Sequence, residues 1–146
     1  MIELQYPIAT PKTRSQAGNR EVFDPIRRKW VHLSPEEWVR QQFLQLLIET
    51  HQYPASLIAV EQSIALGDLQ KRFDILIYDR HHQPWMMIEC KAQSVALDES
   101  VFEQLLRYNM SIPVRYLLIT NGSHCMGWER DGRQAISLRK IPEFAV

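Results

Sequence analysis

Residues 70–91 read QKRFDILIYDRHHQPWMMIECK, and this stretch decides the fold. In residues 70–78 apolar side chains alternate with polar or charged ones, which is typical of a strand with one buried face. Residues 79–84 are rich in turn-forming types, and residues 85–91 are again apolar enough to form a returning strand. The stretch therefore predicts a β-hairpin whose turn spans residues 79–84.

A helix and a strand are predicted before this hairpin. Ser34 can cap the helix, Pro35 suits its first position, and Glu37 completes a capping box. Apolar residues then recur on one helical stripe until Pro54 prevents the helix from continuing. Leu57 to Leu66 reads as the strand that follows.

A second helix and further strands are predicted after the hairpin. Asp98 can cap the helix. Three strands then follow, separated by Asn-Gly and Asp-Gly turns, at residues 114–120, 124–129 and 134–139. A strand, a helix and another strand favour a parallel crossover, whereas tight turns favour antiparallel hairpins, so the sheet should be mixed. We expect an α/β (α+β) fold with helices flanking a mixed central sheet and a core order of α-β-β-β-α-β-β.

Length and composition favour one domain. The chain has 146 residues, of which 45% are hydrophobic, and this is enough for a proper core. Residues 1–33 are rich in proline, arginine and polar residues and show no sustained period. We predict an irregular N-terminal arm there, although residues 30–33 could pair briefly as a strand, and a single domain over residues 34–146.

The net charge of zero gives no global positive field that would indicate a nucleic-acid partner. In residues 1–30, however, six basic side chains outnumber three acidic ones, which is either a local binding patch or a solvated arm. The two cysteines, Cys90 and Cys125, lie far apart in apolar runs and are predicted to be reduced core residues. Neither an export signal nor a membrane span is recognisable, so we expect a cytoplasmic location and no membrane partner.

Charged residues interrupt both strands of the predicted hairpin. Asp74 stands in the first strand, and Glu89 and Lys91 stand in the second. Side chains two residues apart on a strand share a face and lie about 6.6 Å apart, so Glu89 and Lys91 point the same way. With a turn over residues 79–84, the expected cross-strand pairs are Tyr78 with Trp85, Leu76 with Met87, and Asp74 with Glu89. The two carboxylates should then meet across the ladder.

Two arrangements could accommodate opposed carboxylates, which otherwise destabilise a sheet and perturb each other's pKa. One is a divalent cation, because Mg²⁺ typically takes one or two carboxylates, several waters and a substrate phosphate. The other is a ladder of surface salt bridges in which Arg72 and Lys91 pair with the acids. On Asp74, Glu89 and Lys91 alone, the salt-bridge ladder is the favoured interpretation.

The spacing and order of these elements resemble the core of the PD-(D/E)XK nucleases. Fourteen residues separate Asp74 from Glu89-Cys90-Lys91, and the acids lie on consecutive strands after a helix and a strand. Residues 104–108 resemble the Gln-x-x-x-Tyr motif of several nucleases of this superfamily. Residues 35–41, PEEWVRQ, resemble the first helix of the domain that opens the restriction subunit of type I restriction enzymes. The resemblance covers residues 34–120.

The sequence departs from the fuller pattern in two respects. Phe73 rather than proline precedes Asp74, and the chain contains no G-x-x-x-x-G-K-[ST] phosphate loop. A translocating motor would therefore have to come from another polypeptide.

The resemblance implies that Asp74 and Glu89 bind Mg²⁺ or Mn²⁺, with the Cys90 backbone carbonyl as a further ligand. Lys91 would orient or help to deprotonate the attacking water and steady the phosphate. Glu37 could reach the metal from the first helix, but its capping-box role explains it equally well. Gln104 and Tyr108 could position substrate, or could simply form the polar edge of an amphipathic helix.

Three functional hypotheses follow from these residues. The first is a metal-dependent phosphodiester hydrolase acting on nucleic acid, with DNA the expected substrate; a homodimer would suit cleavage of both strands. The second is a catalytically silent module of the same fold that binds nucleic acid or docks to a partner protein, such as a separate motor or specificity subunit. The third is a metabolic enzyme with an unrelated metal site.

Overall fold

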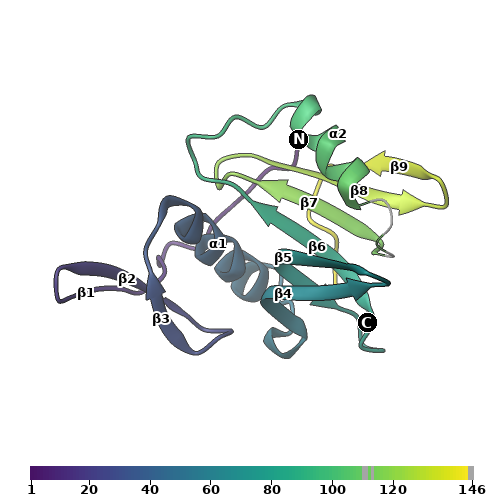
Figure 1. The fold of residues 1–146 in the computed structure, drawn as a ribbon. Coiled ribbons are helices and arrows are strands. Elements are labelled where there is room, and N and C mark those ends of the chain that lie inside the picture. Colours follow the sequence, from purple (N-terminus) through teal and green to yellow (C-terminus); the bar gives the residue numbers. More distant parts are fainter. Residues whose placement is uncertain (110–111, 113, 145–146) are drawn as a thin grey trace.

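The predicted hairpin lies within a mixed sheet, the central sheet (Figure 1). The computed structural model describes residues 1–109, 112 and 114–144, except for the side chains of Leu66, Leu69 and Tyr108. The described strands of the central sheet are, in spatial order, β4 (Ile58–Leu66), β5 (Leu69–Tyr78), β6 (Pro84–Cys90), β7 (Tyr116–Thr120), β8 (Cys125–Asp131) and β9 (Gln134–Ser137). Neighbouring strands are antiparallel except for β6 and β7, which are parallel. The predicted mixed α+β fold is therefore confirmed.

Two helices flank the central sheet. Helix α1 (Pro35–Gln45) precedes β4 and continues into a π-helical turn at Leu46–Thr50, and a 3₁₀ turn at Ala55–Leu57 leads into β4. Helix α2 (Glu99–Asn109) makes the crossover between the parallel strands β6 and β7. Within the described part of the chain, neither helix is long and apolar enough to cross a membrane.

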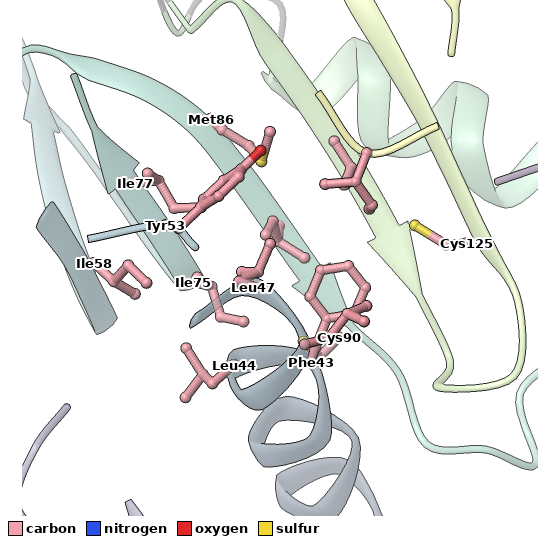
Figure 2. Close-up of a cluster of buried hydrophobic side chains, with 14 of the residues drawn as sticks. Phe43, Leu44, Leu47, Tyr53, Ile58, Ile75, Ile77, Met86, Cys90 and Cys125 are labelled. Atoms are coloured by element: carbon pink, nitrogen blue, oxygen red, sulfur yellow. The ribbon is translucent and has the colours of Figure 1, made fainter. Parts of the chain in front are cut away.

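The helices bury different faces of the sheet. Phe43 and Leu44 of α1 and Leu47 of the π-helical turn are fully buried and belong to one apolar cluster with Ile75 of β5 and Met86 of β6 (Figure 2). On the other face, a second cluster joins Phe102 of α2 to Leu76, Met87 and Leu117 of the sheet. Each fully buried aliphatic or aromatic side chain contributes about 1.5–3 kcal/mol relative to exposure, so the two layers hold the hairpin firmly between them.

Both predicted helix caps form. The Ser34 hydroxyl accepts a hydrogen bond from the Glu37 amide (3.0 Å), and the Asp98 carboxylate accepts one from the Val101 amide (2.9 Å). The reciprocal half of the predicted capping box is wrong, because the Glu37 carboxylate faces Arg27 and other side chains of the protein interior. A charged partner competes successfully with a neutral backbone amide for a carboxylate.

The hairpin register agrees with the prediction at Leu76 and Met87, which pair directly, but not at its end. Tyr78 pairs with Pro84, not with Trp85, and a bulge follows Ile77. The cause is a shorter turn: Asp79 donates its amide to the Gln83 carbonyl (2.8 Å) and accepts the Gln83 amide with its carboxylate (3.0 Å). This turn closes one residue early, and β6 therefore begins at Pro84.

The expectation of an irregular arm over residues 1–33 is also wrong. Strands β1 (Thr13–Gln16), β2 (Asn19–Asp24) and β3 (Lys29–His32) form an antiparallel N-terminal sheet, and β3 contains part of the expected strand at residues 30–33. The residues before β1 are attached to β8, where the Ile2 amide donates to the Cys125 carbonyl (2.8 Å). Strand β1 is exposed at every position, so no apolar alternation marks it in the sequence.

Candidate functional site

Asp74 and Glu89 lie opposite each other where β5 and β6 end their pairing. The described register runs to Ile75 opposite Ile88, and one further step places Asp74 opposite Glu89. Residues opposite each other in an antiparallel pair share a face, so the two carboxylates lie on the same side of the sheet. Strand β6 continues beside β7 as far as Cys90, which pairs with Thr120. The site therefore has β4 beside Asp74 and β7 beside Glu89, at the point where the pairing of β5 with β6 ends.

Asp74 is held through both of its oxygens. Its Oδ1 accepts a hydrogen bond from Arg40 Nη2 (3.2 Å), and its Oδ2 accepts one from the Cys90 amide (2.8 Å). These two donors come from α1 and β6, so they fix the side chain from two directions. An ionised carboxylate has about four lone-pair positions, and Asp74 thus keeps acceptor capacity for a cation.

Glu89 is held more loosely and is electrostatically strained. Burial, and then the negative charge of Asp74, raise the pKa of Glu89 to about 7, while the positive charge of Lys91 partly opposes this rise. Lys91 Nζ lies 3.9 Å from Glu89 Oε1, and these side chains are 39% and 29% exposed. The positive charge of Lys91 therefore does not return the pKa of Glu89 to its ordinary value, and solvent can reach both side chains.

Arg40 of α1 is the buried cation of the site. Its side chain is 5% exposed and lies close to three carboxylates, at 3.3 Å from Glu37, 3.1 Å from Glu61 and 3.2 Å from Asp74. Its Nε is buried without a hydrogen-bond partner among the described atoms. Sequence reasoning missed Arg40, although a charged residue among the apolar positions of a buried helix was a signal that could have marked it.

Glu61 of β4 is a third acid at the same level of the central sheet. Val60 pairs with Ile75 and Gln62 with Phe73, so Glu61 lies between these pairs, across from Asp74. Its φ of 53° is unusual for a residue with a side chain and interrupts the strand. Sequence reasoning missed Glu61 too, although it interrupts an apolar strand as Asp74 and Glu89 do.

The predicted salt-bridge ladder is only partly present. Arg72 pairs with Glu61 at 2.7 Å and not with either acid of the predicted pair, whereas Lys91 does lie next to Glu89. Arg72 and Lys91 were expected to pair with Asp74 and Glu89. The backbone irregularity at Glu61 brings that carboxylate into the reach of Arg72 instead.

The remaining predicted site residues occupy different surroundings. The Glu37 carboxylate is taken up by Arg27 (3.0 Å), Arg40 (3.3 Å) and Gln41 (3.2 Å), so it reaches Asp74 only through Arg40. The Cys90 thiol is buried and unoxidised, as is that of Cys125. Gln104 lies exposed on α2. The side chain of Tyr108 lies outside the described residues.

The carboxylates of Asp74 and Glu89 suit a hard divalent cation whose coordination shell is completed by water and substrate. In the part of the chain that the structure describes, no three histidine, cysteine, aspartate or glutamate side chains gather into a group that could hold a metal alone. A closed zinc site, which needs four protein ligands, is therefore a poor match for these residues. Mg²⁺ and Mn²⁺ prefer oxygen ligands and commonly use one or two carboxylates, and Asp74 with Glu89 offers these.

Comparison with known protein families finds a match that covers most of the chain. The family of the type I restriction enzyme R protein N terminus (HSDR_N) matches residues 35–142, from the first residue of α1 to beyond β9. None of the curated proteins matches the chain. The family match includes the whole central sheet with Asp74, Glu89 and Lys91, and begins after the N-terminal sheet. The chain therefore belongs to the family of type I restriction enzyme R protein N-terminal domains.

Proposed function

We propose that this protein is a divalent-metal-dependent nuclease that hydrolyses phosphodiester bonds, with DNA as its substrate. One observation carries the proposal: Asp74 and Glu89 lie opposite each other on paired strands, with Lys91 Nζ 3.9 Å from the Glu89 carboxylate. Membership of a restriction-enzyme family supports the choice of nucleic acid as substrate. Membership of this family also supports other subunits of a restriction complex, such as a separate specificity or motor subunit, as proposed partners.

The residues have distinct roles in this proposal. Asp74 and Glu89 would hold Mg²⁺ or Mn²⁺, with the Cys90 carbonyl as a further ligand. The bound ion would acidify a water molecule and neutralise charge on the phosphate. Lys91 would hold a phosphate oxygen and orient the attacking water, since an ammonium at the open side of the site can meet the developing negative charge. Gln104 and Tyr108 of α2 would position the nucleic acid.

The raised pKa of Glu89 supports cation binding at this site. Burial and then the negative charge of Asp74 raise the pKa of Glu89 to about 7, so part of the protein retains a proton at this site at neutral pH. A divalent cation between them would displace that proton and remove the repulsion. The repulsion between Asp74 and Glu89 in the metal-free site is therefore relieved by the proposed divalent cation.

A second candidate function is a catalytically silent module that binds nucleic acid or docks to a partner protein. The observation that favours it is Arg40, whose guanidinium already places a permanent positive charge 3.2 Å from Asp74. A structural arginine can take the place of a metal as the counter-charge of an acidic residue. This reading predicts salt-sensitive binding to nucleic acid or to a partner, with no cleavage in any metal.

Cleavage assays with matched variants separate the two functions. Purified protein is incubated with supercoiled, linear and single-stranded DNA and with RNA, in Mg²⁺ or Mn²⁺ and in chelator. Asp74→Asn and Lys91→Ala are compared with Asp131→Asn, which makes the same chemical change at an exposed residue of the β8–β9 turn. We expect metal-dependent cleavage by the wild type and Asp131→Asn, and none by the site variants. Equal activity of Asp74→Asn and the wild type would refute the proposal, and salt-sensitive binding without cleavage would favour the silent module.

A further inference from the structure

Arg27 connects the N-terminal sheet to the candidate site. It lies between β2 and β3, and its guanidinium contacts three carboxylates: Asp24 at 2.6 Å, Glu37 at 3.0 Å and Glu61 at 3.2 Å. Asp24 is the last residue of β2, whereas Glu37 belongs to α1 and Glu61 to β4. A single side chain thus joins three separate elements of the fold.

The carboxylates of Glu37 and Glu61 are both shared between Arg27 and Arg40, and Glu61 also contacts Arg72. Oε1 of Glu37 contacts both Arg27 and Nη1 of Arg40, whereas Glu61 contacts Arg27 through Oε2 and Nη1 of Arg40 through Oε1. The other terminal nitrogen of Arg40, Nη2, contacts Asp74. The chain of contacts therefore runs from Arg27 through two acids to Arg40 and from there to Asp74.

Shared acids explain how Arg27 could influence a residue that it does not touch. Without Arg27, Glu37 and Glu61 would have Arg40 as their nearest shared cation and would compete with Asp74 for its guanidinium. Arg27 pairs with both acids and so reduces their demand on Arg40. Nη2 of Arg40 therefore stays directed at Asp74. Because Arg40 is 5% exposed and Arg27 only 18% exposed, water screens this competition weakly.

Stability alone is a poor explanation of such a network. Buried ion pairs gain little over apolar side chains of similar size, because desolvation offsets most of their attraction. What a rigid guanidinium fork does supply is geometry, since its donors hold carboxylates in fixed directions. The N-terminal sheet also lies outside the family match, which begins at residue 35.

We propose that Arg27 is a positioning residue of the site: the N-terminal sheet holds Glu37 and Glu61 through Arg27, and thereby directs Arg40 onto Asp74. The positioning of Arg40 and Asp74 by Arg27 does not depend on the proposed function. Its consequence for metal binding and cleavage does rest on that function.

A matched pair of variants tests the geometry. Arg27→Gln removes the network contacts, and Arg28→Gln removes the same charge from the adjacent exposed residue. The measured quantity is the hydrogen-exchange rate of the Cys90 amide, which donates to Asp74. NMR monitors this rate in the metal-free protein. Hydrogen bonds to charged groups contribute about 1.5–3 kcal/mol, so we expect exchange at Cys90 to be at least about tenfold faster in Arg27→Gln than in Arg28→Gln.

Stability is measured in parallel so that general loosening is not mistaken for repositioning. If Arg27→Gln does not fold, Arg27→Lys replaces it, because lysine retains the charge but cannot bridge three carboxylates with a planar fork. An unchanged Cys90 amide in a folded variant at position 27 would overturn the proposal. Faster exchange at Cys90, with other core amides unchanged, supports it.

Metal binding and cleavage test the consequence. Loss of residues that orient metal ligands typically costs about 10–100-fold in metal affinity or activity, so we expect Mn²⁺ affinity and kcat to fall about tenfold in Arg27→Gln and to remain unchanged in Arg28→Gln. KM for DNA should not change, because Arg27 does not contact the substrate in this proposal. A variant that changes KM and its salt dependence but not kcat would show a DNA contact and overturn the positioning role. A wild type that does not cleave, while Cys90 still responds to Arg27→Gln, would refute the proposed nuclease function and leave the positioning role supported.

Discussion

Raising the pH should destabilise the metal-free protein through Glu89. Burial and then the charge of Asp74 raise the pKa of Glu89 from 4.5 to about 7 in the folded state, whereas the unfolded chain releases this proton near pH 4.5. Between these values the folded protein binds more protons than the unfolded chain, so the free energy of unfolding falls as the pH rises. The stabilisation is fully present below pH 4.5 and is lost as the pH passes about 7.

The size of the effect follows from the two pKa values. A tenfold difference in proton affinity corresponds to about 1.4 kcal/mol, so the difference between 4.5 and about 7 sets an upper limit of about 3 kcal/mol. The Glu89 side chain is 29% exposed, and screening by water reduces this value. We expect a loss of about 1–3 kcal/mol between pH 4.5 and pH 8 that is attributable to Glu89.

Urea denaturation over this pH range, in chelator, measures the effect. Other groups also titrate, so the informative quantity is the difference between the wild type and Glu89→Gln, which cannot ionise at this position. Glu143→Gln, a change at an exposed glutamate near the end of the chain, should follow the wild type. Addition of Mn²⁺ at pH 8 should restore stability to the wild type more than to Glu89→Gln, because the cation removes the repulsion between the acids.

Parallel stability curves for the wild type and Glu89→Gln would refute this reasoning. They would mean that Asp74 and Glu89 do not interact in the folded protein as their positions on β5 and β6 imply. A steeper loss in Glu89→Gln than in the wild type would show the opposite sign and refute it equally.

Three further predictions concern other parts of the fold. Ser34→Ala should destabilise the protein by about 1 kcal/mol because the Glu37 amide loses its cap; urea denaturation with an unchanged m-value would measure this, and no loss would contradict it. Arg40→Leu should cost about 3–5 kcal/mol because it leaves Asp74 without its arginine and removes one of the cations of Glu37 and Glu61, and a gain in the melting temperature would count against it. Cys90 and Cys125 should resist alkylation at pH 7 until the protein is unfolded in urea, because burial raises the pKa of both thiols; rapid labelling of the native protein would show that they are accessible.

The elements with strong local signals were predictable. The alternation in β5, the Asp79 turn and the caps at Ser34 and Asp98 depend on residues close together in the chain, and the structure contains each of them. The prediction of a mixed sheet also held, because chain order and turn length restrict how strands can connect. The N-terminal sheet was missed because β1 carries no apolar alternation, although Asp24-Pro25 was a turn signal.

The amino-acid sequence by itself determined the hairpin, the helices that flank it and the acids that interrupt its strands. These features follow from periodicity and spacing over a few residues. The resemblance to the R protein N-terminal domain of type I restriction enzymes also came from such short patterns, and the family match confirms it. Only the tertiary structure decided which charges meet. Arg40 and Asp74 are 34 residues apart, as are Arg27 and Glu61, and no local pattern encodes such pairs. Their contacts depend on how α1 packs against the central sheet and how the N-terminal sheet lies against α1, because an ion pair is specified by three-dimensional distance and not by position in the chain.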